Sequence, residues 1–154
     1  MNIYDTWLVT NPLSHRGMFN KEYPENTLGA FQNAINHHYG CELDVQMTTD
    51  GTLVVFHDYD MKRLTGVDGD IRKKSYEEIK NLKIHGSKYS IPTFEEVLKL
   101  VDGKIPLLVE LKHHKHVGEM ERKVRDLLFS KETTFSLRPV IKQKIGKFSL
   151  SRYW

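Results

Sequence analysis

The stretch GCELDVQMTTDGTLVVFHD, residues 40–58, decides how the rest of the chain is interpreted. Glu42 and Asp44 stand two residues apart in an apolar run, so a strand would place both carboxylates on one face. A buried carboxylate is costly unless a positive group meets it. One such acid would suggest a buried ion pair, whereas two acids followed by a strand-end His57 favour a site for metal binding and acid–base chemistry.

The same stretch predicts a hairpin. Asp50-Gly51 indicates a turn, and residues 53–56 form a second short apolar strand. The link between the two strands is too short for a helical crossover, so they should be antiparallel neighbours. A simple antiparallel return would carry His57 away from Asp44, and we therefore expect a bent or offset return.

Composition predicts a single soluble domain. The chain has 154 residues, of which 39% are hydrophobic and 28% charged, as in globular proteins. Cys41 is the one cysteine, so no disulfide framework forms within the chain, and it should be a small core residue. There is no signal peptide and no apolar run long enough to span a membrane, which predicts a cytoplasmic protein.

Charge is distributed unevenly. Residues 1–110 carry 12 basic and 16 acidic residues, whereas residues 111–154 carry 11 basic and 4 acidic ones. A basic end can bind nucleic acid or an anionic membrane. This one has neither interleaved aromatic residues nor a nucleic-acid motif, so we expect no nucleic-acid partner.

Signals for helix starts recur along the chain. Asn26 or Thr27 is expected to cap a first helix, which Gly40 would terminate. The apolar stripe of this helix consists of Leu28, Phe31, Ala34 and Ile35. Two capping boxes predict two more helices: Ser75 with Glu78, and Thr93 with Glu96. A last amphipathic helix carries Val117, Met120, Val124, Leu127 and Leu128.

Two polar segments offer weaker metal signals. Residues 59–74 read as a long loop near the site, and their three aspartates do not have the spacing of an EF-hand loop. His113, His114 and His116 could bind a transition metal, but a solvated loop is the better interpretation. From Ser130 onward we find no clean helical or strand period.

Strands alternate with helices, which predicts an α/β fold with a largely parallel sheet. A weak strand over residues 7–13 comes first, and the most hydrophobic strand spans residues 105–111. In such folds, sites gather at the carboxyl ends of strands. The polar residues at or near these ends are His15, Arg16, Glu42, Asp44, His57, Glu110 and Lys112.

A set of short motifs occurs in a specific order. They are His15-Arg16-Gly17, Pro24-Glu25-Asn26-Thr27, Glu42-Leu43-Asp44-Val45, Asp50-Gly51, His57-Asp58, Ile91-Pro92-Thr93 and Glu110-Leu111-Lys112. In this order they resemble the glycerophosphodiester phosphodiesterase family, in particular its bacterial cytosolic type. The resemblance covers about residues 10–128, so we divide the chain into the N-terminal part of that domain, residues 1–128, and an atypical basic tail, residues 129–154.

The resemblance implies a TIM-type barrel that hydrolyses glycerophosphodiesters, which are small molecules, to glycerol 3-phosphate and an alcohol. It implies that His15 and His57 are the acid–base pair and that Arg16 and Lys112 bind the phosphate. It also implies that the metal ligands are Glu42, Asp44 and Glu110. Three carboxylates without a thiolate suit a hard cation such as Mg²⁺ or Ca²⁺. The attacking group, water or the glycerol 2-hydroxyl, stays open.

A TIM barrel typically needs about 250 residues. The sequence therefore predicts a C-terminally truncated chain that forms only the N-terminal part of the barrel, with exposed sheet edges that favour self-association. Two alternatives to the phosphodiesterase follow. One is an inactive fragment that binds metal or phosphate without turnover, and the other is a lysophospholipase D-like enzyme.

Overall fold

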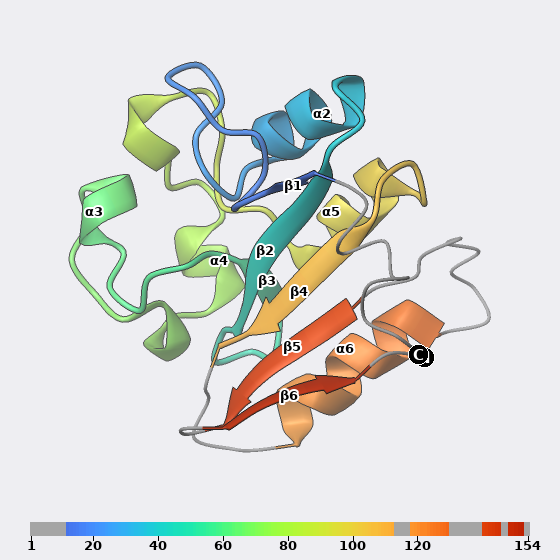
Figure 1. The fold of residues 1–154 in the computed structure, drawn as a ribbon. Helices are drawn as coiled ribbons and strands as arrows, with labels where there is room; N and C mark the ends of the chain where they lie inside the picture. The colour runs from blue at the N-terminus through green and yellow to red at the C-terminus, as the bar shows by residue number, and fades with distance from the viewer. Residues whose placement is uncertain (1–11, 113–117, 130–139, 146–147, 153–154) are drawn as a thin grey trace.

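The computed structural model describes residues 12–112, 118–129, 140–145 and 148–152. These residues form a six-stranded sheet with helices packed beside it (Figure 1). The strands are β1 (Leu13–Ser14), β2 (Gly40–Met47), β3 (Leu53–Val55), β4 (Leu107–Leu111), β5 (Val140–Ile145) and β6 (Phe148–Arg152). The α-helices are α2 (Leu28–Asn36), α3 (Lys62–Thr65), α4 (Tyr76–Ile79), α5 (Phe94–Val101) and α6 (Glu119–Phe129).

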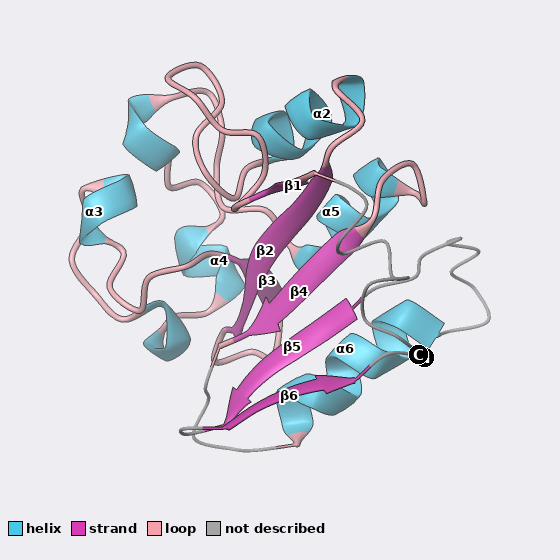
Figure 2. Ribbon diagram, viewed as in Figure 1, coloured by secondary structure: helices cyan, strands magenta, loops and turns pink. Residues whose placement is uncertain are grey.

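The sheet has the order β1-β2-β4-β5-β6, and β3 pairs with β2 off this path. The β1–β2, β2–β4 and β4–β5 pairs are parallel, while β3 and β6 are antiparallel to their neighbours. Helices separate the parallel strands along the chain, as parallel pairing requires (Figure 2). This alternation confirms the predicted α/β class.

One face of the sheet carries the main hydrophobic core. Alternate residues of β2 and β4 point into it, among them Leu43, Val45 and Val109, all fully buried. Helices α2, α5 and α6 cover this face with Phe31, Phe94 and other apolar side chains. The other residues of the two strands are left to face the opposite side, which is where the acids lie.

Beyond β3, the polar segment folds around a second hydrophobic cluster. Its buried members include Phe56, Met61, Leu64 and Ile71. The expectation of a long loop over residues 59–74 is therefore wrong in part. Helix α3 and a 3-10 turn (Ile71–Lys73) interrupt the segment, because its few apolar side chains are buried together.

Helix starts follow the local sequence closely. Thr27 caps α2 by accepting a hydrogen bond from the Ala30 amide, and both predicted capping boxes are present. Gly40, however, does not terminate α2, which ends at His37 as its cap. Gly40 instead begins β2, where a Cβ would lie 3.0 Å from the Leu13 side chain and 3.1 Å from that of Pro106. Close strand packing explains this glycine.

The C-terminal segment departs from expectation. Residues 140–145 form β5 beside β4, and residues 148–152 return as β6, although the sequence shows no clean strand period there. Pairing with β4 decides this segment, because strand preference depends on the neighbouring strand more than on the intrinsic preference of each residue. The predictions for residues 7–11 and for the histidines at 113, 114 and 116 lie outside the described residues. Among the described helices, none is long and apolar enough to cross a membrane.

A matched pair of phenylalanines tests the main core. Phe94 is fully buried, whereas Phe129 is 56% exposed at the end of α6. We expect Phe94→Ala to lower the free energy of unfolding by about 3–5 kcal/mol because it leaves a cavity between α5 and the sheet. Phe129→Ala should change it by about 0.5 kcal/mol or less. Urea unfolding followed by circular dichroism measures both, and equal losses would contradict this description of the core.

Candidate functional site

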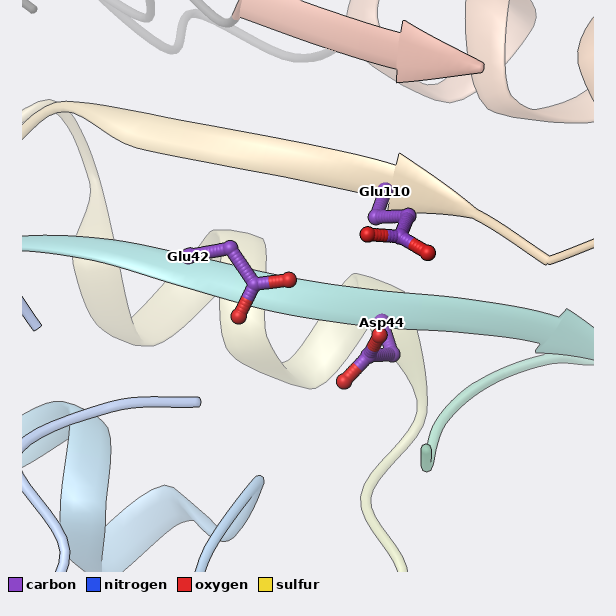
Figure 3. Close-up of side chains that lie close together, drawn as sticks. All are labelled: Glu42, Asp44 and Glu110. Carbon is purple, nitrogen blue, oxygen red and sulfur yellow. The ribbon is translucent and has the colours of Figure 1, made fainter. Parts of the chain in front are cut away.

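Three carboxylates converge on the face of the sheet opposite the main core. Glu42 and Asp44 come from β2 and Glu110 from β4, and one oxygen of each lies within 4.8 Å of the others (Figure 3). Asp44 and Glu110 are direct partners in the parallel β2–β4 register. The cluster forms because Glu42 and Asp44 are two residues apart on one face of β2 and because the register places Glu110 beside Asp44. The acids stand within the strands, not at their very ends.

The cluster brings like charges close together in a partly buried place. Burial, followed by the charges of Asp44 and Glu110, raises the pKa of Glu42 to about 7. Lys112 offsets part of the repulsion, since its ammonium lies 2.8 Å from Asp44 Oδ1 and 2.9 Å from Glu110 Oε1. Burial opposes the charge on Lys112, but these two contacts prevail and raise its pKa.

The loop after β1 closes one side of the cluster. Arg16 donates its backbone N–H to Glu42 at 3.0 Å, and its Nε lies 3.6 Å from Asp44 Oδ2. Its Nη1 donates to Glu25 at 2.9 Å. Arg16 takes a left-handed conformation at φ 58°, which costs energy for a residue with a Cβ. The contacts to three carboxylates account for that conformation.

Asn26 has a role that the sequence did not reveal. It was expected as a possible helix cap, but its fully buried side chain donates to Asp44 Oδ2 at 2.9 Å. Its backbone N–H donates to the Arg16 carbonyl, and both residues are left-handed. Asn26 therefore orients Asp44 and joins the helix start to the loop after β1.

His15 lies at the edge of the cluster. Its Nε2 is 3.9 Å from Glu42 Oε2, and its side chain is 67% exposed. The ring is therefore open to a molecule arriving from solvent while it stays next to the carboxylates.

The hairpin brings His57 towards the cluster, and the expected bent return is wrong. The β2–β3 register is regular, with Val45 opposite Val55, and the Phe56 amide donates to the Asp44 carbonyl at 2.9 Å. Because Asp44 stands well before the end of β2, an ordinary antiparallel return brings the chain back level with it. His57 follows by one residue.

Gln46 secures this return. Its buried amide group donates to the carbonyl oxygens of Phe56 and Asp58, each at 2.8 Å, and more weakly to that of His57 at 3.3 Å. The residue lies on the same face of β2 as Glu42 and Asp44. The spacing of two along β2 would have drawn attention to it, but its partners come from the fold.

The side chain of His57 is held by an acid. Its Nδ1 lies 2.7 Å from Asp58 Oδ1. The Arg63 guanidinium, together with His57, holds the pKa of Asp58 down at about 2, so this carboxylate is ionised at neutral pH. An open cavity of about 670 Å³ lies here. It is lined by His57, Asp58, Tyr59, Asp60, Lys62, Arg63 and Lys112.

The residues present fit a divalent cation. Among the described residues, Glu42, Asp44 and Glu110 form one group of oxygen donors close enough to share an ion. Oxygen-only donor sets suit hard cations. Burial first, and then the neighbouring acids, raise the pKa of Glu42, and a positive charge bound beside it would favour its ionised form.

The comparisons with known proteins agree with this geometry. A model of the "Glycerophosphoryl diester phosphodiesterase family" matches residues 15–150. A glycerophosphodiester phosphodiesterase of Bacillus altitudinis is 39% identical over 129 residues, which cover 77% of this chain and 52% of the relative. One of Caldanaerobacter subterraneus is 42% identical over 104 residues, which cover 63% and 42%.

The structure is similar to that of an Oleispira antarctica phosphodiesterase solved in complex with the product sn-glycerol-3-phosphate. The TM-score is 0.77 and the sequences are 27% identical, over 86% of this chain and 57% of that one. The predicted TIM-barrel class is confirmed, and the described strands form part of such a barrel. The chain spans about half the length of the curated relatives it matches.

The family match extends to residue 150, past the point at which the sequence motifs end. It therefore includes β5 and most of β6. The division of the chain at residues 128 and 129 stays a prediction.

The contact between Asp58 and Arg63 predicts an acid-dependent loss of stability. The pKa of Asp58 in the folded chain, about 2, lies below its ordinary value of 3.8. Ionised Asp58 therefore stabilises the fold above pH 3.8, and this contribution is lost as the pH falls towards 2. Compared with the parent chain, Asp58→Asn should be less stable at neutral pH, and its stability should fall less between pH 4 and pH 2.

Urea unfolding at a series of pH values measures this difference. Asp68→Asn is the control, because it makes the same change in net charge at a 74% exposed carboxylate that pairs with Lys62. The same pH slope in Asp58→Asn and the parent chain would contradict the prediction.

Proposed function

The chain belongs to the glycerophosphoryl diester phosphodiesterase family, and we propose that its carboxylate cluster and flanking histidines hydrolyse glycerophosphodiesters to glycerol 3-phosphate and an alcohol. One observation carries the proposal. Three carboxylates each place one oxygen within 4.8 Å of the others. His15, Arg16 and Lys112 lie within 4 Å of them, and His57 and Lys112 line the adjoining cavity. This combination suits a phosphodiester, whose phosphate needs both a cation and groups that transfer protons.

Glu42, Asp44 and Glu110 would hold the cation, which we propose is Mg²⁺ or Ca²⁺. When bound, such an ion polarises a phosphoryl oxygen and lowers the pKa of a coordinated hydroxyl. Asn26 and Lys112 keep Asp44 in place, each through a contact shorter than 3 Å. The oxygens are thus oriented before an ion arrives, which reduces the cost of reorganisation.

Arg16 and Lys112 would bind the phosphate. Both are partly buried cations that already lie near Asp44, at 3.6 Å and 2.8 Å, so their charges lie beside the proposed site of the ion. In phosphodiester cleavage, negative charge accumulates on the non-bridging oxygens of the phosphorus. Two fixed cations offset that charge without any rearrangement.

His15 and His57 would act as the acid–base pair. One would remove the proton from the attacking group, water or the glycerol 2-hydroxyl, and the other would give a proton to the leaving alcohol oxygen. Where the 2-hydroxyl attacks, a water molecule then opens the cyclic phosphate to give glycerol 3-phosphate. Each such transfer contributes about 10²–10⁴-fold to the rate. His57 has Nδ1 bound to Asp58, which leaves Nε2 for the reaction. His15 is open to solvent beside Glu42, where it can exchange protons.

Release of glycerol 3-phosphate tests the activity. We expect the chain to release it from glycerophosphocholine and glycerophosphoethanolamine with Mg²⁺ or Ca²⁺, and not with EDTA. His15→Ala and His57→Ala should each lower kcat by about 10²–10⁴-fold because each removes one proton transfer. The control is His37→Ala, at the exposed end of α2.

Three results would count against this proposal. Metal-dependent binding of glycerol 3-phosphate without turnover would indicate a binding protein. Choline release that is faster from lysophosphatidylcholine than from glycerophosphocholine would indicate a lysophospholipase D. Equal activity in His15→Ala and the parent chain would remove His15 from the mechanism. Size-exclusion chromatography of the same samples tests the proposed self-association.

Metal binding can be measured without turnover. Asp44→Asn and Glu110→Gln should each weaken the binding of Mg²⁺ and Ca²⁺ at least about tenfold, because affinity follows the number of charged ligands. Isothermal titration calorimetry measures the binding. The control is Glu95→Gln, an exposed carboxylate on α5 that pairs with Lys99. Equal binding in all variants would show that the cation lies elsewhere.

A further inference from the structure

Arg63 on α3 binds two acids at once. Its Nε and Nη2 donate to Asp58 at 2.6 and 3.0 Å, and its Nη1 and Nη2 donate to Glu25 at 3.2 and 2.8 Å. Asp58 follows β3, and Glu25 precedes α2, 38 residues before Arg63 in the sequence. A single guanidinium therefore joins two segments that are distant in the chain.

On the β3 side, this contact reaches His57. Asp58 accepts from Arg63 and also meets His57 Nδ1 at 2.7 Å. An ionised carboxylate has no proton to donate, so Nδ1 must carry the hydrogen of this bond. The neutral ring then has its free lone pair on Nε2. The orientation and tautomer of His57 thus depend on where Asp58 stands.

On the α2 side, the contact reaches Arg16, the proposed phosphate-binding residue, through Glu25. Glu25 is 8% exposed and accepts from Arg16 as well as from Arg63. Burial opposes its charge, but the two guanidinium groups prevail and lower its pKa. Glu25 consequently stays ionised and keeps Arg16 beside Asp44.

Arg63 is anchored well enough to hold these groups. Its neighbours Met61 and Leu64 are 1% exposed and belong to the second hydrophobic cluster, which fixes the short helix α3. The side chain itself is 47% exposed, so its ion pairs alone contribute little to stability. Two forked contacts on a fixed helix are better suited to setting geometry than to stabilising the fold.

We propose that Arg63 is a positioning residue that, through Asp58, holds His57 with Nδ1 protonated and Nε2 available for the reaction. The proposal rests on the proposed function for the role of His57, but not for its tautomer. Arg63 acts through its contacts with Asp58 and Glu25, not by binding the substrate or the cation itself. It acts by keeping Asp58 from turning away from the ring, with Glu25 as its second anchor.

The tautomer of His57 is measurable in the full chain labelled with ¹⁵N-histidine. Nuclear magnetic resonance distinguishes protonated from unprotonated ring nitrogens when the ring is neutral, and His57→Gln assigns the signals. We expect Nδ1–H to predominate in the parent chain. In Arg63→Gln and Asp58→Asn, the preference should weaken towards a mixture of the two tautomers.

Two further variants separate geometry from charge and from surface effects. Arg63→Lys keeps the charge, but a lysine cannot fork to both acids, so it should also weaken the preference. Arg125→Gln removes an exposed guanidinium that pairs with the adjacent Asp126 on α6, and it should change nothing. If Arg63→Gln does not fold, Arg63→Lys decides by the same measurement.

Kinetics provide the second readout. Arg63→Gln should lower kcat about tenfold or more, the size seen when a functional histidine loses its outer partner, with a smaller change in KM. An unchanged His57 tautomer in Arg63→Gln or Arg63→Lys would overturn the proposal. If the parent chain does not turn over glycerophosphocholine, the proposed function fails, while the tautomer still supports or overturns the role of Arg63.

Discussion

The site depends on one constraint, which is that three carboxylates are placed close together on one face of a sheet. Parallel pairing sets Asp44 against Glu110, and the period of the strand adds Glu42 to the same face. Such a cluster costs free energy unless cations compensate for it. Lys112, Arg16 and Asn26 are arranged around it, and a divalent ion would complete the compensation.

Burial of apolar side chains in the hydrophobic cores offsets the free-energy cost of placing these acids together. Leu43 and Val45 alternate with the acids along β2 and pack against α2, α5 and α6 on the other face. One strand therefore serves the core and the site at the same time. This division arises because a strand turns successive side chains to opposite faces, and the described helices α2, α5 and α6 cover the face that carries Leu43 and Val45.

The second hydrophobic cluster stabilises the segment that follows β3. It folds the segment after β3 into a compact unit, which fixes His57, Asp58 and Arg63 relative to the sheet. Gln46 adds hydrogen bonds from β2 to the same segment. Binding and catalytic residues are often on loops that a rigid scaffold positions, and the second hydrophobic cluster and Gln46 support the loop here.

The sequence by itself determined what depends on near neighbours. The alternation of Glu42 and Asp44 with apolar residues, the Asp50-Gly51 turn and the capping boxes of α4 and α5 all rest on contacts within a few residues. Only the tertiary structure decided the partners of Asn26, Gln46 and Arg63, and the pairing of β5 with β4. It also decided the regular return that brings Phe56 level with Asp44, with His57 one residue further on. These depend on strand register and on contacts between segments up to 38 residues apart, and no local pattern specifies which distant group a side chain will meet.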